Sequence, residues 1–388
     1  MNGESMQASQ RRRLTNDNLQ QDFYRPELDA MRFFAFLCIF LHHTLTQPAA
    51  AHMAKYLTIR NNFAVSAKFA VSLFFMLSGY LISTLLEMEK ERTGKVHLAE
   101  FYKRRIARIW PLYYAFTILV LLIGTIVPHV LPSGQAVAAS TFFAGNWFLI
   151  FGGSGFIGGL GILWSVNVEE QFYVIWPLIA KYSDRRTFIS AATAILITAY
   201  IVLAVFGMRG IISDLSLRFN TLVEMQFFAA GALLAIYLPR QGPRLPAGLR
   251  ILLASIGILL WMGGTRFFGE MVPVSLSAWW EPAALYACVL AGCIALFISF
   301  IGIPSRFIPP KIQWLGKISY GLYVYHALVL TLTPRPPVAW RYQAILAVAR
   351  LCLELSIAVL LAGLSYRWLE APFLRWKERV TFIHNRRA

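Results

Sequence analysis

The stretch TFISAATAILITAYIVLAVFG, residues 187–207, contains no charged side chain. A helix needs about 20 mostly apolar residues to cross the hydrocarbon layer of a bilayer, so this stretch predicts a membrane-spanning helix. About ten such stretches follow one another along the chain. Their approximate spans are 31–50, 68–88, 109–128, 162–180, 187–207, 219–239, 250–266, 281–302, 317–333 and 343–368. The sequence therefore predicts an all-α fold, a polytopic membrane helix bundle of about ten transmembrane helices.

The composition agrees with a membrane protein. Of the 388 residues, 57% are hydrophobic and 14% are charged, whereas soluble domains usually carry about 25% charged residues. The formal net charge of +17 comes from 36 Lys and Arg residues, which form short clusters between the apolar stretches. This distribution indicates a lipid bilayer as partner and no nucleic acid. The four cysteines lie in apolar stretches without metal-type spacing, and no metal site is predicted.

The basic clusters predict the orientation of the chain, because cytoplasmic loops are enriched in Lys and Arg. The clusters assigned to the cytoplasmic side are 11–13, 103–108, 181–186, 240–250, 306–317 and the C-terminal cluster. Both termini are then cytoplasmic, with tails at 1–28 and 377–388 and a membrane domain at 29–376. The glycine-rich stretch 129–161 is expected to be an outer loop, because its apolar run 142–151 is too short to cross.

The first apolar stretch carries an arginine and two histidines, in YRPELDAMRFFAFLCIFLHHT at 24–44. Arg32 and His43 are about three helical turns apart, so they share one helix face at a separation of about 16 Å along the axis. His42 points about 100° away. Burial disfavours the charged imidazole, and a neutral imidazole can accept a proton from a hydroxyl group. His43 is therefore a candidate general base; the alternative is that both histidines only hydrogen-bond across helices.

The second polar signal is FYKRRIARIWPLYY at 101–114, at the predicted inner end of the third span. Arg105 and Arg108 are three residues apart, and Arg104 is four residues before Arg108, so these side chains are neighbours on a helix. Guanidinium groups bind phosphate oxygens in a bidentate way, and a coenzyme A donor brings several phosphates from the cytoplasm. The alternative is a positive-inside anchor or a contact with lipid headgroups.

The third signal is LWSVNVEEQFYVIWP at 163–177, near the predicted outer end of the fourth span. It holds Glu169 and Glu170, and Tyr173 follows Glu169 by about one helical turn. Carboxylates are rare inside membranes unless they have a function. Glu169 could orient a histidine, hold an acceptor hydroxyl or pair with an arginine; the alternative is a helix-start carboxylate favoured by the helix dipole.

Three shorter stretches add candidates. In FFMLSGYLIS, at 74–83, Ser78 and Gly79 indicate close helix packing. In GKISYGLYVYH, at 316–326, Tyr320 and His326 are candidates for polar side chains that line a cavity. Glu370, in WLEAPF at 368–373, is expected to cap a helix or form an ion pair at the inner surface.

Taken in this order, six stretches of the chain closely resemble the acyltransferase type 3 family of integral membrane acyltransferases. The resembling stretches are PELDAMRFFAF…HH, FFMLSGYLI, FYKRRIARIWPLYY, LWSVNVEEQFYVIWP, GKISYGLYVYH and EAPF. The resemblance implies an acyl-CoA donor from the cytoplasm, expected to be acetyl-CoA, in the cell inner membrane. It implies acceptors such as polysaccharide sugars, peptidoglycan, Nod factors and macrolides. Some family members carry a fused SGNH-type hydrolase domain, and this chain is expected to be a membrane-only member.

The family motifs also imply roles for individual residues. The motif of an arginine, ten residues and a histidine matches Arg32 and His43, and in the family this histidine is held to be essential for transfer. The Arg-x-x-Arg motif, linked to the donor, matches Arg105 and Arg108. The Trp-Ser-x-x-x-Glu motif begins at Trp164.

We therefore predict an enzyme, an O-acetyltransferase that acts on a hydroxyl of a sugar-containing acceptor. His43 either deprotonates this hydroxyl or is transiently acylated. The predicted site residues are His43, Glu169 and Arg32 for catalysis, Arg105, Arg108 and Arg104 for the donor, and His42, Trp164, Ser165, Tyr173, Tyr320 and His326 for the substrate. The rival prediction is a proton-coupled secondary transporter, because polar residues inside a ten-helix bundle also suit that class.

Overall fold

The computed structural model describes residues 24–46, 58–156, 159–211, 213–268, 279–333 and 340–378. These residues form helices, turns and loops, and no strand occurs among them. Most of the two predicted tails lies outside this part of the chain. The first helix already begins at Pro26, inside the range predicted as the N-terminal tail.

The main helices follow the predicted spans in order. They are α2 (Pro26–Leu45), α4 (Ala70–Thr93), α5 (Leu98–Ile126), α8 (Trp164–Tyr182), α9 (Arg185–Met208), α11 (Thr221–Tyr237), α12 (Ala247–Phe268), α13 (Glu281–Phe300), α15 (Ser319–Leu332) and α16 (Trp340–Ser365). Within the described residues, 7 helices are long and apolar enough to cross a membrane. The predicted all-α polytopic membrane bundle is therefore confirmed. The number of crossings and the side on which the termini lie stay predictions.

Shorter elements connect or extend these helices. They are α3 (Thr58–Ser66), η2 (Ala67–Phe69), η3 (Pro128–Val130), α6 (Gly134–Thr141), α7 (Gly145–Ile150), η4 (Leu160–Leu163), α10 (Asp214–Arg218), η6 (Ser305–Phe307), α14 (Pro310–Lys317), the π-helical turn η7 (Tyr366–Glu370) and α17 (Ala371–Glu378). The apolar run 142–151 contains α7, a helix of 6 residues. This helix is too short to cross a bilayer.

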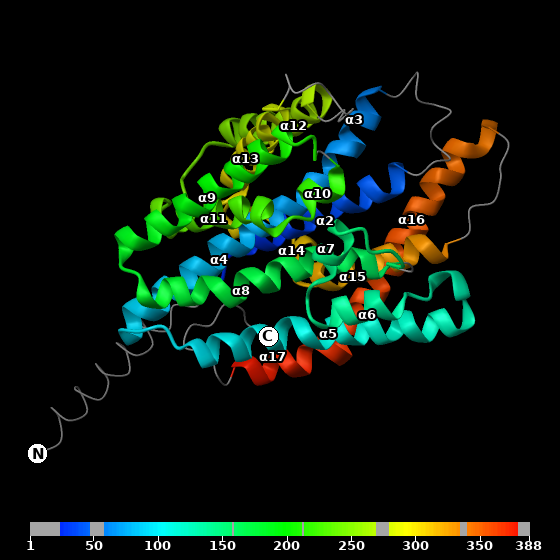
Figure 1. The fold of residues 1–388 in the computed structure, drawn as a ribbon, viewed down its shortest axis with the longest axis horizontal. Helices are drawn as coiled ribbons and strands as arrows, with labels where there is room; N and C mark the ends of the chain where they lie inside the picture. Colours follow the sequence, from blue (N-terminus) through cyan, green and yellow to red (C-terminus); the bar gives the residue numbers. More distant parts are fainter. Residues whose placement is uncertain are drawn as a thin grey trace, which may run out of the picture.

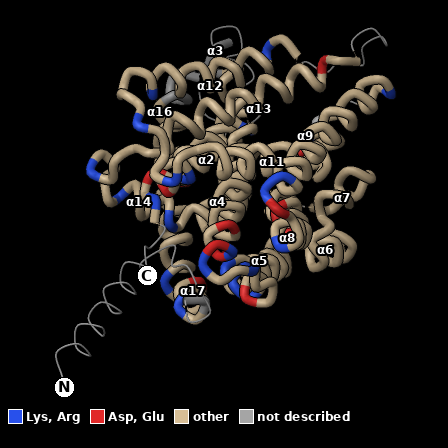
Figure 2. Tube along the Cα trace, turned by 90° about the vertical axis from the view of Figure 1, so that its left-hand side faces the viewer, with Lys and Arg blue, Asp and Glu red and all other residues tan. Residues whose placement is uncertain are grey.

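The long helices lie side by side along the long axis of the molecule (Figure 1). Helix α4 lies near the middle, with α12 and α13 above it and α5 and α17 below it in this view. The most extensive contacts join α4 to α11, α9 to α11, α12 to α13, and α15 to α16. Figure 2 shows charged residues near α5, α8, α14 and α17, whereas most of the bundle carries other residue types.

The outside of the bundle is suited to lipid. Ile201 in α9, Leu259 in α12 and Leu360 in α16 are each more than half exposed. Exposing this much apolar surface to water is unfavourable, at roughly 25 cal/mol for each Å². In a bilayer these side chains contact acyl chains instead, while the helical backbone satisfies its own hydrogen bonds.

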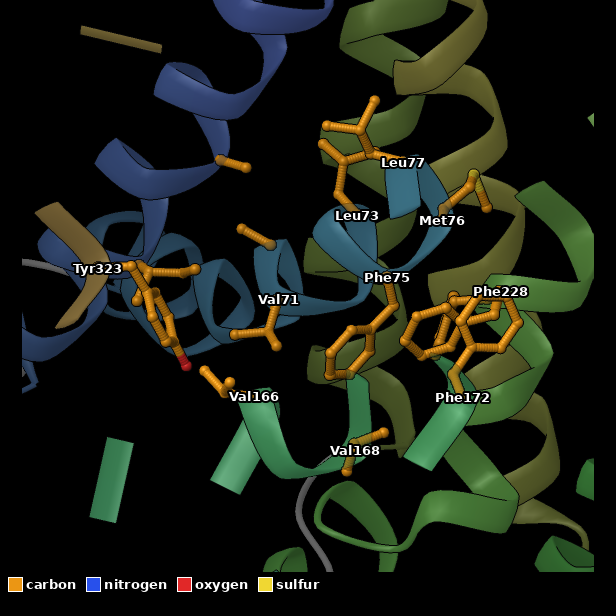
Figure 3. Close-up of a cluster of buried hydrophobic side chains, with 14 of the residues drawn as sticks. Val71, Leu73, Phe75, Met76, Leu77, Val166, Val168, Phe172, Phe228 and Tyr323 are labelled. Atoms are coloured by element: carbon orange, nitrogen blue, oxygen red, sulfur yellow. The ribbon is translucent and has the colours of Figure 1, made fainter. Parts of the chain in front are cut away.

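Aromatic side chains and glycines hold α4, α8 and α11 together. The ring of Phe228 in α11 stacks on Phe75 in α4 at 4.8 Å and on Phe172 in α8 at 4.2 Å between centroids (Figure 3). Gly79 in α4 and Gly231 in α11 lie at the contact between these two helices, where a Cβ atom on either would overlap the backbone of the other helix. The expected role of Gly79 in close helix packing is therefore confirmed.

Candidate active site

Most of the predicted site residues line two neighbouring cavities in the bundle. The first, which we call the arginine cavity, has a volume of about 100 Å³. Its polar lining side chains are Arg32, Ser78, Arg105, Arg108, Ser165, Glu169, Tyr173, Ser319, Tyr320 and Tyr323. The second, the histidine cavity, has a volume of about 310 Å³. Its lining includes His42, His43, Lys68, Trp164, Arg218, Phe219 and Tyr323.

The two cavities share two lining residues, and we call this pair the partition. Val71 and Tyr323 line both of them, and both are labelled in Figure 3. The Tyr323 hydroxyl lies 2.6 Å from the Ser165 hydroxyl and donates to the carbonyl oxygen of Ile162 at 3.2 Å. These hydrogen bonds hold the tyrosine in place between the cavities.

One helix serves both cavities. Along α2, Arg32 lines the arginine cavity and His43 lines the histidine cavity. Because α2 is helical over this whole distance, the two side chains are about 16 Å apart along its axis, as the sequence predicts. Arg32 is held in place by an ion pair with Asp29, at 2.6 Å.

Three histidines, His42, His43 and His326, lie close together. The ring centroid of His43 is 4.9 Å from that of His42 and 5.3 Å from that of His326. His42 Nδ1 lies 2.7 Å from the carbonyl oxygen of Ala64. His326 is fully buried, and its Nδ1 lies 2.6 Å from the carbonyl oxygen of Tyr323. A carbonyl only accepts, so Nδ1 carries the proton in both rings and Nε2 is an acceptor.

The Nε2 atom of His326 has no hydrogen-bond partner among the described residues. A buried acceptor without a partner is costly, and such atoms often have a functional role. Of the ring centroids near that of His326, the centroid of His43 is the closest, at 5.3 Å. His326, which was expected to line a cavity, is not among the residues that line the arginine or the histidine cavity; its ring lies beside that of His43, which lines the histidine cavity.

Glu169 belongs to the arginine cavity. Its carboxylate accepts hydrogen bonds from the Ser78 and Tyr173 hydroxyls. The Arg105 guanidinium lies over the Tyr173 ring at 5.4 Å from its centroid. Of the three roles considered for Glu169, the orientation of a histidine has no support in this placement, because Glu169 lines the arginine cavity and His43 lines the histidine cavity.

The predicted donor-binding arginines separate into two groups. Arg105 and Arg108 line the arginine cavity. The Nε–H group of Arg105 is buried and has no hydrogen-bond partner among the described residues. Arg104 instead donates to Glu89 at 2.7 Å. The Glu89 carboxylate also accepts from the backbone of His97. Arg104 thus links the start of α5 to α4 through this ion pair. The predicted role of Arg104 in binding the acyl donor has no support in this geometry.

The remaining predicted substrate residues divide between the cavities. His42 and Trp164 line the histidine cavity. Ser165, Tyr173 and Tyr320 line the arginine cavity. The candidates therefore lie close together, but in two compartments that the sequence did not distinguish.

Two cationic residues of the histidine cavity were missed by sequence reasoning. Lys68 in η2 and Arg218 in α10 both line it. Their sequence signal was weak: both belong to the minority of basic residues on the predicted outer side, where the positive-inside rule disfavours them. Such exceptions to the rule could have been taken as functional candidates.

Comparison with known proteins identifies the family of the chain. Residues 25–369 match the family of acyltransferase domains. The chain belongs to this family, which confirms the resemblance of its motifs and bears out the predicted class of enzyme, an acyltransferase. No solved structure matches the chain at a significant level.

Two curated relatives illustrate the similarity. The peptidoglycan O-acetyltransferase OatA of Listeria monocytogenes is 26% identical over 369 residues, which cover 90% of this chain and 56% of the relative. The O-acetyltransferase OatA of Staphylococcus aureus is 27% identical over 373 residues, which cover 90% of this chain and 57% of the relative. The chain thus spans less than three fifths of the length of these relatives.

Proposed function

We propose that this protein moves an acetyl group from cytoplasmic acetyl-CoA to a hydroxyl of a glycan-containing acceptor, and that it works in the cytoplasmic membrane. The observation that carries this proposal is the pair of adjoining cavities, one lined by arginines and the other by histidines. The names of the relatives, peptidoglycan O-acetyltransferase and O-acetyltransferase, support acetyl as the group and a glycan as the acceptor.

The arginine cavity is suited to the donor. Its volume of about 100 Å³ is far too small for the whole coenzyme, so only the thioester end of the pantetheine arm would enter it. Arg105 offers a buried N–H without a partner among the described residues, which fits a phosphate or amide oxygen of the donor. The bulky nucleotide would remain toward the cytoplasm, near Arg108.

The transfer can take two routes at His43. In the first, His43 accepts the hydroxyl proton, the hydroxyl oxygen bonds to the thioester carbonyl carbon, the carbon–sulfur bond breaks, and the thiolate takes up the proton. In the second, an imidazole nitrogen displaces the thiolate first, and the acceptor oxygen then displaces the imidazole. The thioester reaches His43 past the partition of Val71 and Tyr323 in both routes.

Labelled acetate tests the proposed function in cells. Cells with and without the protein are grown in labelled acetate, and their surface glycans and small glycosides are compared by mass spectrometry. An ester-linked label that requires the protein supports acyl transfer. Purified protein that consumes no acetyl-CoA with any extracted glycan, but moves protons or solutes across vesicle membranes, would favour the transporter instead.

Replacing Arg105 by glutamine is expected to raise the KM for acetyl-CoA by about tenfold to a hundredfold, because a charge-assisted hydrogen bond contributes about 1.5–3 kcal/mol. The measurement is the initial rate of acetyl transfer at varied acetyl-CoA. Arg186→Gln is the matched control, since Arg186 is exposed at the start of α9. Equal effects of both substitutions would mean that Arg105 is only a membrane anchor.

Replacing His326 by asparagine is expected to lower kcat by about ten- to a hundredfold, with KM values changed less than about twofold. The asparagine amide can still donate to Tyr323 but offers no acceptor in place of Nε2. Glutamine places its amide oxygen closer to that position, so His326→Gln should retain more activity. A rise in KM without a fall in kcat would show that His326 does not position His43.

A further inference from the structure

The histidine cavity contains two cations that the transfer chemistry does not use. Lys68 and Arg218 line it from two different elements, η2 and α10, and both side chains are half-buried. Both basic side chains line a space of about 310 Å³ beside His43.

An aromatic surface fixes the position of Arg218. The rings of Trp164 and Phe219 stack at 4.4 Å between centroids with an angle of 18°. The Arg218 guanidinium carbon lies 5.5 Å from the Trp164 centroid and 5.0 Å from the Phe219 centroid. Stacking of this kind holds a guanidinium in one orientation, so that less freedom is lost when its N–H groups bind an oxyanion.

We propose that the histidine cavity binds an acceptor with an anionic group, a carboxylate or a phosphate, which Lys68 and Arg218 hold while His43 faces the hydroxyl to be acylated. This inference rests on the proposed function. The donor phosphates do not compete for these cations, because the donor enters through the arginine cavity beyond the partition. A half-buried anion paired with two cations is attracted more strongly than one in bulk water.

The volume and walls of the cavity agree with such an acceptor. About 310 Å³ lies at the lower end of the range for small-molecule sites, which suits a single sugar unit with a charged substituent. Trp164 and Phe219 are among the lining residues and contribute apolar atoms to the wall of the cavity. The charge would come either from a carboxylate on the sugar or from the phosphate of a lipid-linked glycan.

The first experiment identifies the charge of the natural product. Cells that produce the protein or its His43→Ala variant are grown in labelled acetate, and acetylated glycans that depend on His43 are isolated. Mass spectrometry and anion-exchange chromatography then show whether the acetylated unit carries a carboxylate or is attached through a phosphate. A neutral acetylated unit overturns the inference but leaves the proposed function intact. The absence of any acetylated product that requires the protein, in comparison with cells that lack it, overturns both.

The second experiment tests the two cations directly. The isolated product is deacetylated and offered, with acetyl-CoA, to the purified protein and to its Lys68→Gln and Arg218→Gln variants. Each substitution is expected to raise the acceptor KM by about tenfold to a hundredfold, with the KM for acetyl-CoA unchanged. Arg209→Gln is the control, because Arg209 is exposed at the end of α9 and does not line the cavity.

Neutralised acceptors distinguish the source of the charge and the role of the cations. Reduction of a carboxylate on the acceptor to an alcohol, or removal of its phosphate, should raise the acceptor KM of the unmodified protein to the value of the variants. If the variants instead lower kcat equally for charged and neutralised acceptors, the cations stabilise the tetrahedral oxyanion and the inference is wrong. Unchanged kinetics in both variants would overturn it as well.

Discussion

Replacing His43 by alanine is expected to reduce acetyl transfer by about a hundredfold to ten-thousandfold, the range that a positioned proton-transfer group contributes. His43 is only partly buried and lines a cavity, so its removal leaves the packed helix contacts in place. The amount of protein in the membrane should therefore stay close to that of the unmodified chain. The measurement is the transfer of labelled acetyl in isolated membranes, divided by the amount of protein.

The control for this substitution is His129→Ala. His129 is exposed in η3 and lies outside both cavities, so its removal should not change the rate. If His43→Ala retained full activity, the base would have to be sought in His42 or His326. Rapid quenching with labelled donor also separates the two routes, because only the acyl-histidine route leaves the label on the protein.

Replacing Gly231 by valine is expected to cause the largest loss of stability. A Cβ at this position would lie 2.0 Å from the carbonyl oxygen of Met76, so α4 and α11 would have to move apart. Overpacking commonly costs about 1–3 kcal/mol and sometimes more, and here the obstacle is backbone that cannot rotate away. We expect little folded protein in the membrane and a lower thermal midpoint for the detergent-solubilised remainder.

Gly263→Ala is the matched control, because nothing lies within 4 Å of a Cβ added at Gly263 in α12. In a helix interior, alanine is about 1 kcal/mol more favourable than glycine. The control should therefore be as stable as the unmodified protein or slightly more so. A Gly231→Val variant with normal yield and midpoint would mean that the contact between α4 and α11 can relax.

The presence and order of the main helices could be predicted from the sequence, but their ends could not: α5 begins at Leu98, whereas the predicted span begins at 109. Hydropathy placed the first span at 31–50, whereas α2 begins at Pro26 and ends at Leu45. The discrepancy arises because Glu27 and Asp29 count as polar in any hydropathy sum. In the folded chain both are buried, where Glu27 pairs with Arg25 at 2.8 Å and Asp29 pairs with Arg32. Both ion pairs are local in sequence, and the i,i+3 spacing of Asp29 and Arg32 could have indicated a helix that begins before Arg32.

Part of the site was predictable because it depends on spacing within one helix. The distance between Arg32 and His43 follows from helical geometry alone, and so does the neighbourhood of Arg105 and Arg108. The roles of Arg104 and Arg218 depend on partners elsewhere in the chain. Arg104 contacts Glu89 in the preceding helix, and Arg218 reaches the cavity only because α10 packs beside Trp164. No periodicity in the sequence encodes such contacts.

The partition of Val71 and Tyr323 also bears on energy conservation in the cell. A continuous water-filled path through the bundle would let protons flow down their electrochemical gradient, worth about 2.3 kcal/mol for each charge and 100 mV. Val71 and the hydrogen-bonded Tyr323 line both cavities, at the place where such a path would have to pass. On the proposed function, these two side chains would let an uncharged acyl group pass when they move aside, and would otherwise hinder the passage of protons.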